Sequence, residues 1–126
     1  MNVPKDRKYT REHEWVKLRP DGTALVGITE FAQSQLGDIV YLDLPKPGMS
    51  LKQFDKFGEI ESVKSVSDLF IPVSGEVVES NERAVQEPEV VNHSPNEEGW
   101  LLKIKVKDAS ELANLLSAED YDRISK

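Results

Sequence analysis

The chain has 126 residues, the length of a single domain, and can bury roughly two-thirds of its unfolded surface. Hydrophobic residues make up only 38%, and 23 acidic against 16 basic residues give a net charge of −7. We therefore expect a thin core under a charged surface, and no basic face for nucleic acid or anionic membranes. The absence of cysteine excludes disulfides, a thiolate nucleophile and a zinc ribbon.

The first ten residues, "MNVPKDRKYT", contain no apolar segment of a signal peptide and no basic amphipathic presequence. No apolar run elsewhere approaches the length that spans a membrane. We therefore expect a cytoplasmic protein of the bacterial type, with no targeting sequence and no membrane partner.

The first predicted elements are two strands, "HEWVKL" and "TALVGI", joined by the turn "RPDG". In the second strand Ala24, Val26 and Ile28 share one face. A short helix follows, because Thr29 is a suitable N-cap and Gly37 can end the helix.

The middle of the chain predicts further short strands. They are "DIVYLDL", "FGEIESV", two strands within "DLFIPVSGEVVES" that bend at Pro72 and Gly75, and "WLLKIKVK". The last alternates most clearly, with apolar residues on one face and lysines on the other.

The C-terminal segment, about 108–124, predicts helix. Asp108 and Ser117 are candidate N-caps. A stripe formed by Leu112, Leu115 and Leu116 is expected to pack against the strands.

One internal similarity has two interpretations. "LPKPGMSL" and "IPVSGEVV" share an apolar residue, Pro, Gly and a final apolar residue at the same spacing. The similarity is either common Pro-x-x-Gly turn chemistry or the trace of two related half-domains, and both interpretations stay open.

Sequence motifs of self-sufficient catalysis are absent. The chain has no GxSxG, P-loop, GxGxxG or HExxH motif. Its two histidines, His13 and His93, are distant in sequence, and His13 is interpreted as a surface histidine on a strand. The many carboxylates are interpreted as a solvated surface. We expect no metal site and no enzyme.

Lys64, in "ESVKSVSD", lies between small serines and the β-branched Val63 and Val66. It is either an ordinary solvated turn residue or a primary amine presented at a hairpin tip for modification. Acylation there would remove one positive charge and attach a long arm.

Several motifs resemble the glycine cleavage H-protein family. They are "YTREHEWV", "GITEFAQSQLGDIVYLDLP", "FGEIESVKSVSDLFIPVSGEVVESN", "EPEVVN", "EGWLLKIKV" and "DASELANLLSAEDY". The resemblance covers residues 9 to about 124. The residues around Lys64 differ from biotinyl domains, which have Met on both sides of the lysine, and from the Asp-Lys-Ala of 2-oxo acid dehydrogenase lipoyl domains.

The resemblance implies a mostly β fold, a flattened barrel-sandwich hybrid of the lipoyl/biotinyl carrier type with short helices. Residues 1–126 would form one lipoyl-carrier domain, with a lipoyl hairpin around 59–72 and the C-terminal helical segment at about 108–124. Lys64, at the hairpin tip, would carry lipoate through an amide.

The resemblance also implies a non-catalytic shuttle. A pyridoxal-phosphate glycine decarboxylase would load the arm with the aminomethyl group of glycine. A tetrahydrofolate-dependent aminomethyltransferase would unload it, and dihydrolipoyl dehydrogenase would reoxidise the arm. A lipoate ligase or a lipoyl/octanoyl transferase would attach it.

In the family, the loaded arm folds into a cleft of the carrier. Glu14 and Asp68 match positions that line this cleft. Glu12 stands where some members have a small polar residue, and Gln35 where some have His.

Two other functions fit the same residues. The chain could be a lipoyl relay protein that donates lipoate to 2-oxo acid dehydrogenases, because the attachment site would look the same. It could also be an acidic all-β interaction domain whose Lys64 is never modified.

Overall fold

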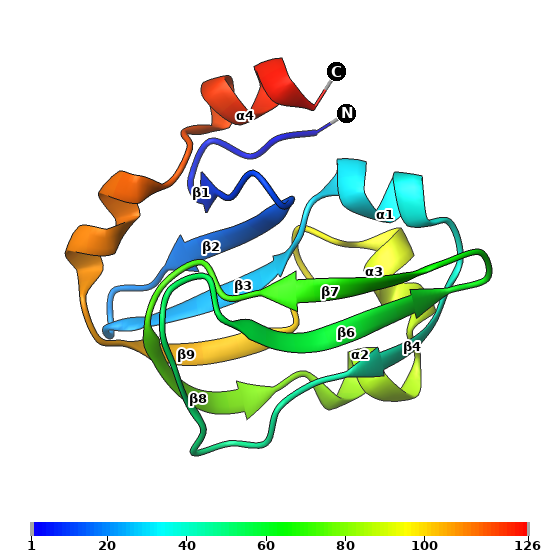
Figure 1. The fold of residues 1–126 in the computed structure, drawn as a ribbon, viewed down its shortest axis with the longest axis horizontal. Coiled ribbons are helices and arrows are strands. Elements are labelled where there is room, and N and C mark those ends of the chain that lie inside the picture. Colours follow the sequence, from blue (N-terminus) through cyan, green and yellow to red (C-terminus); the bar gives the residue numbers. More distant parts are fainter. Residues whose placement is uncertain (1, 126) are drawn as a thin grey trace.

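The computed structural model of the chain describes residues 2–125 and contains two β-sheets that pack face to face (Figure 1). The larger sheet is six-stranded, in the order β1 (Lys8–Tyr9), β2 (Glu14–Leu18), β3 (Thr23–Ile28), β9 (Leu102–Val106), β8 (Gly75–Ser80) and β5 (Ser50–Leu51). The smaller is three-stranded, in the order β4 (Ile39–Asp43), β6 (Lys56–Ser62) and β7 (Val66–Phe70). The sheets do not close into a barrel. The predicted mostly β sandwich with short helices is confirmed.

Within residues 2–125, five short helical segments surround the sheets. They are α1 (Glu30–Leu36), α2 (Glu82–Gln86), α3 (Glu89–His93), the 3₁₀ helix η1 (Ala109–Asn114) and α4 (Ala118–Ile124). The three predicted N-caps are present: the side chains of Thr29, Asp108 and Ser117 accept hydrogen bonds from backbone amides of the first turn. None of the helices within residues 2–125 is long and apolar enough to cross a membrane.

The main core lies between the sheets. Ala24, Val26 and Ile28 of β3 are buried there, as their shared face predicts, together with Leu102 and Ile104 of β9. Burial of these side chains is the main stabilising contribution, at about 25 cal/mol per Å² of apolar surface removed from water.

A second apolar cluster lies beside β1 and α4 and contains Tyr9, Trp15, Ala118 and Tyr121. The rings of Tyr9 and Tyr121 stack with centroids 4.8 Å apart. This cluster holds α4 against β1, near the start of the chain (Figure 1).

His13 is not the surface strand histidine that the sequence suggested. It precedes β2, has a left-handed backbone with φ 73°, and its Nδ1 lies 2.8 Å from the Tyr121 hydroxyl. Thr29 Oγ1 lies 2.6 Å from the same hydroxyl. The three side chains therefore connect α4 to the turn before β2.

The two similar segments occupy equivalent places. Residues 44–51 lead from β4 of the small sheet into β5 of the large sheet, and residues 71–78 lead from β7 of the small sheet into β8 of the large sheet. Strands β5 and β8 then pair with each other. Both segments serve as crossings between the sheets, the geometry that related half-domains would have.

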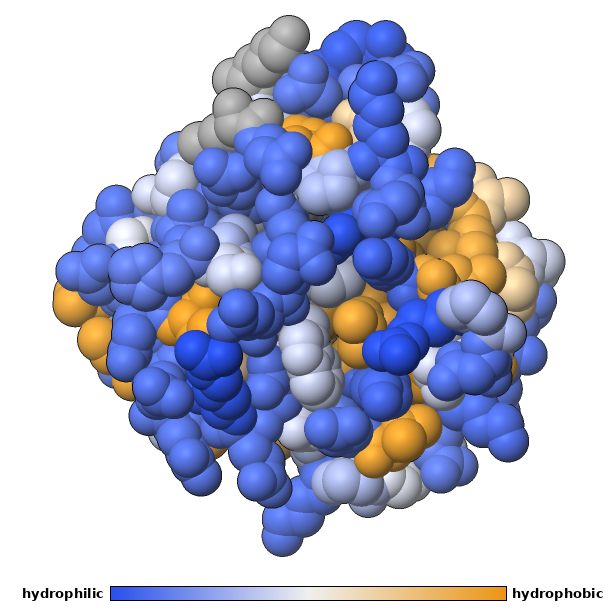
Figure 2. Space-filling model, turned by 180° about the vertical axis from the view of Figure 1, so that it is seen from behind, coloured by the Kyte–Doolittle hydropathy of each residue, from blue (hydrophilic) through white to orange (hydrophobic). Residues whose placement is uncertain are grey.

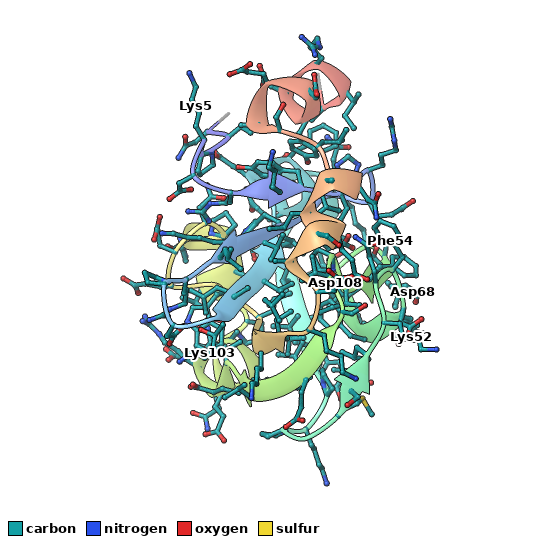
Figure 3. The ribbon with its side chains drawn as sticks, turned by 90° about the vertical axis from the view of Figure 1, so that its left-hand side faces the viewer. Lys5, Lys52, Phe54, Asp68, Lys103 and Asp108 are labelled. Atoms are coloured by element: carbon teal, nitrogen blue, oxygen red, sulfur yellow. The ribbon has the colours of Figure 1, made fainter. Side chains whose placement is uncertain are left out.

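The outer face of the large sheet is mostly polar. Figure 2 shows the molecule from behind the view of Figure 1, and hydrophilic side chains cover most of this surface. Lys103 lies on this side, opposite Asp68 and Phe54 on the side of the small sheet (Figure 3).

Candidate functional site

Lys64 lies at the tip of the hairpin formed by β6 and β7, and its side chain is exposed. The tip extends beyond the sandwich in Figure 1. Its neighbours Val63 and Val66 are also exposed, at 68% and 60%. The amine of Lys64 is therefore open to a modifying enzyme.

A compact turn holds the tip in place. The buried Ser62 donates its backbone N–H to the Ser65 carbonyl at 2.8 Å. Its hydroxyl accepts hydrogen bonds from the backbone amides of Lys64 and Ser65, at 3.3 and 3.1 Å. This local side-chain cap satisfies the amides that a two-residue turn leaves free.

The tip is also anchored to the segment that follows α1. The Val63 N–H donates to the Asp38 carbonyl at 3.0 Å. Next to it, Gly37 has φ 80°, and a Cβ there would lie 3.6 Å from Cε of Lys64. That distance is an ordinary van der Waals contact, so it is the positive φ, and not a lack of space beside Lys64, that favours glycine here.

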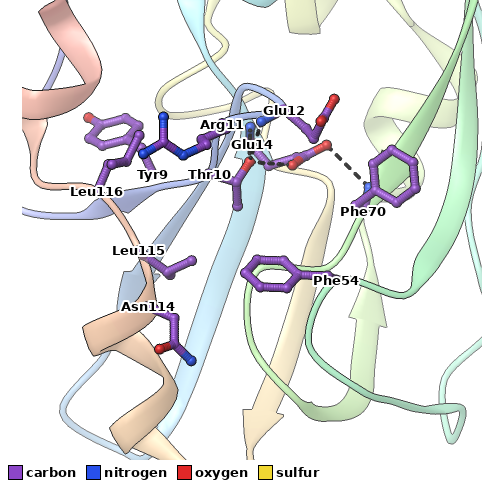
Figure 4. Close-up of a pocket in the computed structure, with 10 residues that line it drawn as sticks. All are labelled: Tyr9, Thr10, Arg11, Glu12, Glu14, Phe54, Phe70, Asn114, Leu115 and Leu116. Atoms are coloured by element: carbon purple, nitrogen blue, oxygen red, sulfur yellow. Dashed lines mark hydrogen bonds between the residues drawn. The ribbon is translucent and has the colours of Figure 1, made fainter. Parts of the chain in front are cut away.

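A pocket of about 500 Å³ lies at the other end of β7. Its lining residues come from β1, the turn after it and the start of β2, from the loop before β6, from the end of β7, and from the end of η1 with the segment that follows it (Figure 4). They are Tyr9, Thr10, Arg11, Glu12, Glu14, Phe54, Phe70, Asn114, Leu115 and Leu116. Leu116 is fixed there by reciprocal backbone hydrogen bonds with Tyr9, at 2.9 and 2.8 Å.

Glu14 is a buried carboxylate in this pocket, with a relative exposure of 1%. Its Oε1 accepts a hydrogen bond from the Thr10 hydroxyl at 2.5 Å, and its Oε2 accepts one from the Phe70 N–H at 3.2 Å. Because Glu14 belongs to β2 and Phe70 to β7, the carboxylate links the two sheets at the floor of the pocket.

Burial has the largest effect on the pKa of this carboxyl group. Desolvation raises the pKa of Glu14 to about 7, against the lowering effect of the hydrogen bonds from Thr10 and Phe70. A positive charge entering the pocket would favour the ionised carboxylate and would itself be stabilised.

The raised pKa predicts a pH dependence of stability. Between about pH 4.5 and 7 the folded chain keeps a proton on Glu14 that the unfolded chain has lost, so stability falls as pH rises and then levels off. The slope contributed by Glu14 is at most about 1.4 kcal/mol per pH unit. We expect Glu14→Gln to remove this contribution, measured as the difference between the urea-unfolding free energies of variant and parent across this range. A difference that does not change with pH would contradict the burial account.

Asp68, the other predicted cleft residue, does not line this pocket. Its carboxylate lies 3.1 Å from the ammonium of Lys56 and is 49% exposed. It shares the outer face of β7 with Val66 and Phe70, because alternate residues of a strand point the same way. Asp68 therefore lies between the tip at Lys64 and the pocket at Phe70.

The two departures from the family pattern fall in different places. Glu12 lines the pocket, whereas Gln35 is an exposed residue of α1 outside it. Sequence reasoning missed Phe54, whose ring points across the pocket toward Leu115 (Figure 4). A phenylalanine in a loop carries no recognisable signal of such a position.

Comparisons with known proteins agree with this architecture. The family model for glycine cleavage H-protein matches residues 7–126. The chain is 55% identical over 125 residues to the glycine cleavage system H protein of Chlorobium phaeobacteroides, with 98% of each chain covered. It is 53% identical over 124 residues to that of Bacteroides fragilis, with the same coverage.

A solved structure gives the same result. The crystal structure of a glycine cleavage system H protein from Mycobacterium marinum superimposes with a TM-score of 0.86 at 39% identity, covering 96% of this chain and 97% of that one. The family expected from the motifs around Lys64 is thus confirmed: the chain belongs to the glycine cleavage H-protein family.

Proposed function

We propose that the protein is the lipoyl-carrying shuttle of a glycine cleavage system, with lipoate attached to Lys64. The observation that carries the proposal is an exposed primary amine on a hairpin tip that hydrogen bonds hold in place, in a chain that belongs to the H-protein family. An amide-linked lipoyl group would supply the disulfide that accepts the aminomethyl group of glycine. The protein itself contributes presentation and protection and performs no chemistry of its own.

The proposed partners act in sequence. A glycine decarboxylase loads the arm, an aminomethyltransferase transfers the one-carbon unit to tetrahydrofolate, and dihydrolipoyl dehydrogenase reoxidises the dithiol. A lipoate ligase or lipoyl/octanoyl transferase attaches the arm. One tethered arm replaces three encounters with a free cofactor, so its reach sets the effective concentration at each enzyme.

The pocket at Glu14 is the proposed resting place of the loaded arm. Phe70 lies six positions after Lys64 along the hairpin, which is on the order of 20 Å at about 3.3 Å per residue. A lipoyl-lysine side chain extends over roughly 16 Å by standard bond lengths. The two lengths are similar, so the end of the arm can reach the mouth of the pocket along the outer face of β7.

Glu14 and Asp68 are given different parts in this proposal. The cationic amine of the cargo would pair with the buried carboxylate of Glu14, where little water screens the interaction. Asp68 would meet the arm on its way, in an exposed position where charge pairs contribute only about 0–1 kcal/mol.

Label transfer tests the proposal directly. The lipoylated protein is incubated with glycine decarboxylase and glycine labelled at its α-carbon, and the label is expected on the peptide that contains Lys64. Addition of aminomethyltransferase and tetrahydrofolate should then remove it. Failure of the protein to take up any label would refute the shuttle function.

The acidic surface predicts salt-sensitive partner binding. Asp43, Glu59 and Asp68 are neighbours across the three strands of the small sheet, and Lys56 pairs with the latter two. A carrier with a net charge of −7 should meet basic surfaces in short-lived complexes.

We therefore expect the Kd for the aminomethyltransferase to rise by roughly tenfold between 50 and 500 mM salt. Isothermal titration at several salt concentrations measures it. A Kd that stays constant across this range would indicate an apolar contact instead.

A further inference from the structure

The loop before β6 holds a phenylalanine in a backbone conformation that disfavours it. The Asp55 N–H donates to the Lys52 carbonyl at 2.9 Å, which closes a turn, and Phe54 is the third residue of this turn with φ 70°. A positive φ at that place is normally supplied by glycine or asparagine. An aromatic side chain there is strained, and such strain concentrates at functional sites.

Surrounding hydrogen bonds maintain the strained conformation. The Phe54 N–H donates to the Ile71 carbonyl at 2.7 Å, and the Gln53 N–H donates to the Ser74 hydroxyl at 2.9 Å. The Gln53 side chain also donates to the carbonyls of Pro72 and Glu111. These bonds hold the loop to the crossing that follows β7 and to η1.

Core packing does not account for the aromatic ring. Phe54 is 51% exposed and belongs to neither apolar cluster. Its ring instead points into the pocket toward Leu115, on the side opposite the Thr10 and Glu14 hydrogen bond (Figure 4). The strained residue therefore lines the pocket and is not part of either apolar cluster.

We propose that Phe54 is a positioning residue for the loaded arm, whose ring covers the apolar part of the arm and keeps water from the cargo held at Glu14. This inference rests on the proposed function. It adds Phe54 to the predicted cleft contacts, Glu14 and Asp68, and assigns to Phe54 the covering of the pocket.

Water is the reactant that such a cover would exclude. Loss of cargo consumes one water: the thioether-linked aminomethyl group becomes a free thiol, formaldehyde and ammonia. The C–S and C–N bonds of the same carbon break and a C=O bond forms, with no change in oxidation state. An apolar ring over the reacting carbon slows this hydrolysis by lowering the local supply of water.

Phe54→Gly separates this role from a structural one. Glycine adopts φ 70° without strain, so we expect urea unfolding at the same or a higher midpoint than in the parent. Lipoylation at Lys64 should be unchanged, and release is compared between carriers loaded to the same extent. Release of formaldehyde without aminomethyltransferase should be about fivefold faster, which corresponds to about 1 kcal/mol at 1.4 kcal/mol per tenfold.

Two control variants bracket the result. Phe54→Leu keeps an apolar side chain at the mouth of the pocket and should stay within about twofold of the parent's release rate. Met49→Ala removes a side chain with the same 51% exposure that does not line the pocket, and it should release cargo at the parental rate.

A second readout needs no lipoyl group. In the unmodified protein, ¹³C NMR titration of Glu14 should show its pKa moving toward the ordinary value in Phe54→Gly, because water gains access. Arg11 and Glu12 also line this pocket and are unchanged in the variant, so their effect on Glu14 is common to both proteins.

Two results would overturn the inference while leaving the shuttle intact. The first is that Phe54→Gly releases formaldehyde at the same rate as the parent and shows the same Glu14 titration. The second is that Phe54→Gly unfolds at a lower urea midpoint than the parent, which would mean that the ring serves packing. A parent protein that takes up no label from glycine would instead refute the proposed function, and the inference with it.

Discussion

Lys64→Arg should abolish glycine cleavage while leaving the fold unchanged. Arginine keeps the positive charge but lacks the primary amine that an acyl group requires. Lys64 is exposed on a turn whose hydrogen bonds are made by backbone amides and by Ser62, so the free energy of unfolding should change by no more than roughly 0.5 kcal/mol. Glycine-dependent CO₂ release in the reconstituted system and urea unfolding measure the two effects.

Lys56→Arg is the matched control for this substitution. Lys56 is another exposed lysine of the same hairpin, and arginine can keep its ion pairs with Glu59 and Asp68. It should retain full glycine cleavage. Turnover by Lys64→Arg above the level seen without carrier would show that Lys64 is not the attachment site.

Glu14→Gln should shorten the lifetime of the loaded carrier by about tenfold. The substitution keeps the size of the side chain and removes the charge that would hold the cargo's amine, and a charge pair in a buried site is worth more than one at the surface. Lipoylation and loading should be preserved, because Glu14 is remote from the hairpin tip. Formaldehyde and ammonia released without aminomethyltransferase give the rate.

Two further carboxylate variants show whether position decides the effect. Asp68 lies on the proposed path of the arm, and Asp68→Asn should speed release by less than about threefold, as expected for an exposed charge pair. Asp43→Asn, an exposed carboxylate of the same sheet outside the pocket, should have no effect. Equal cargo lifetimes in the parent, Glu14→Gln and Asp68→Asn would show that no carboxylate clamp exists.

Local signals were enough to predict much of the fold. Thr29, Asp108 and Ser117 cap their helices with side-chain hydrogen bonds, and hydroxyl or carboxylate residues before a helical pattern are strong signals. Helices α2 and α3 were missed for the same physical reason. Each has five residues, and neither N-cap makes a side-chain hydrogen bond.

Long-range arrangement was harder to predict. The bend at Pro72 and Gly75 was expected, but not that β7 and β8 lie in different sheets, because alternation shows which residues share a face and not which sheet they join. Glu14 and Val16 are two positions apart in β2, so their side chains point to the same face. Both are buried. A carboxylate on the core face of a predicted strand could have identified Glu14 as buried. The interpretation of all acidic residues as a solvated surface overlooked this signal.

The position of Lys64 and the geometry of the pocket differ in how they depend on sequence. The turn at Lys64 is local, since Ser62 and Ser65 close it. The pocket combines residues from positions 9 to 116, which only the tertiary fold brings together. Phe54 reaches the pocket from a turn position with a positive φ. Sequence prediction expects glycine or asparagine at such a position, and not phenylalanine.

Peptide mapping by mass spectrometry of the protein purified from lipoate-replete cells tests the central claim most directly. The account predicts one lipoyl group per chain, on the peptide that contains Lys64, and none on the other ten lysines. An unmodified Lys64 in such cells, or a lipoyl group on any other lysine, would contradict it.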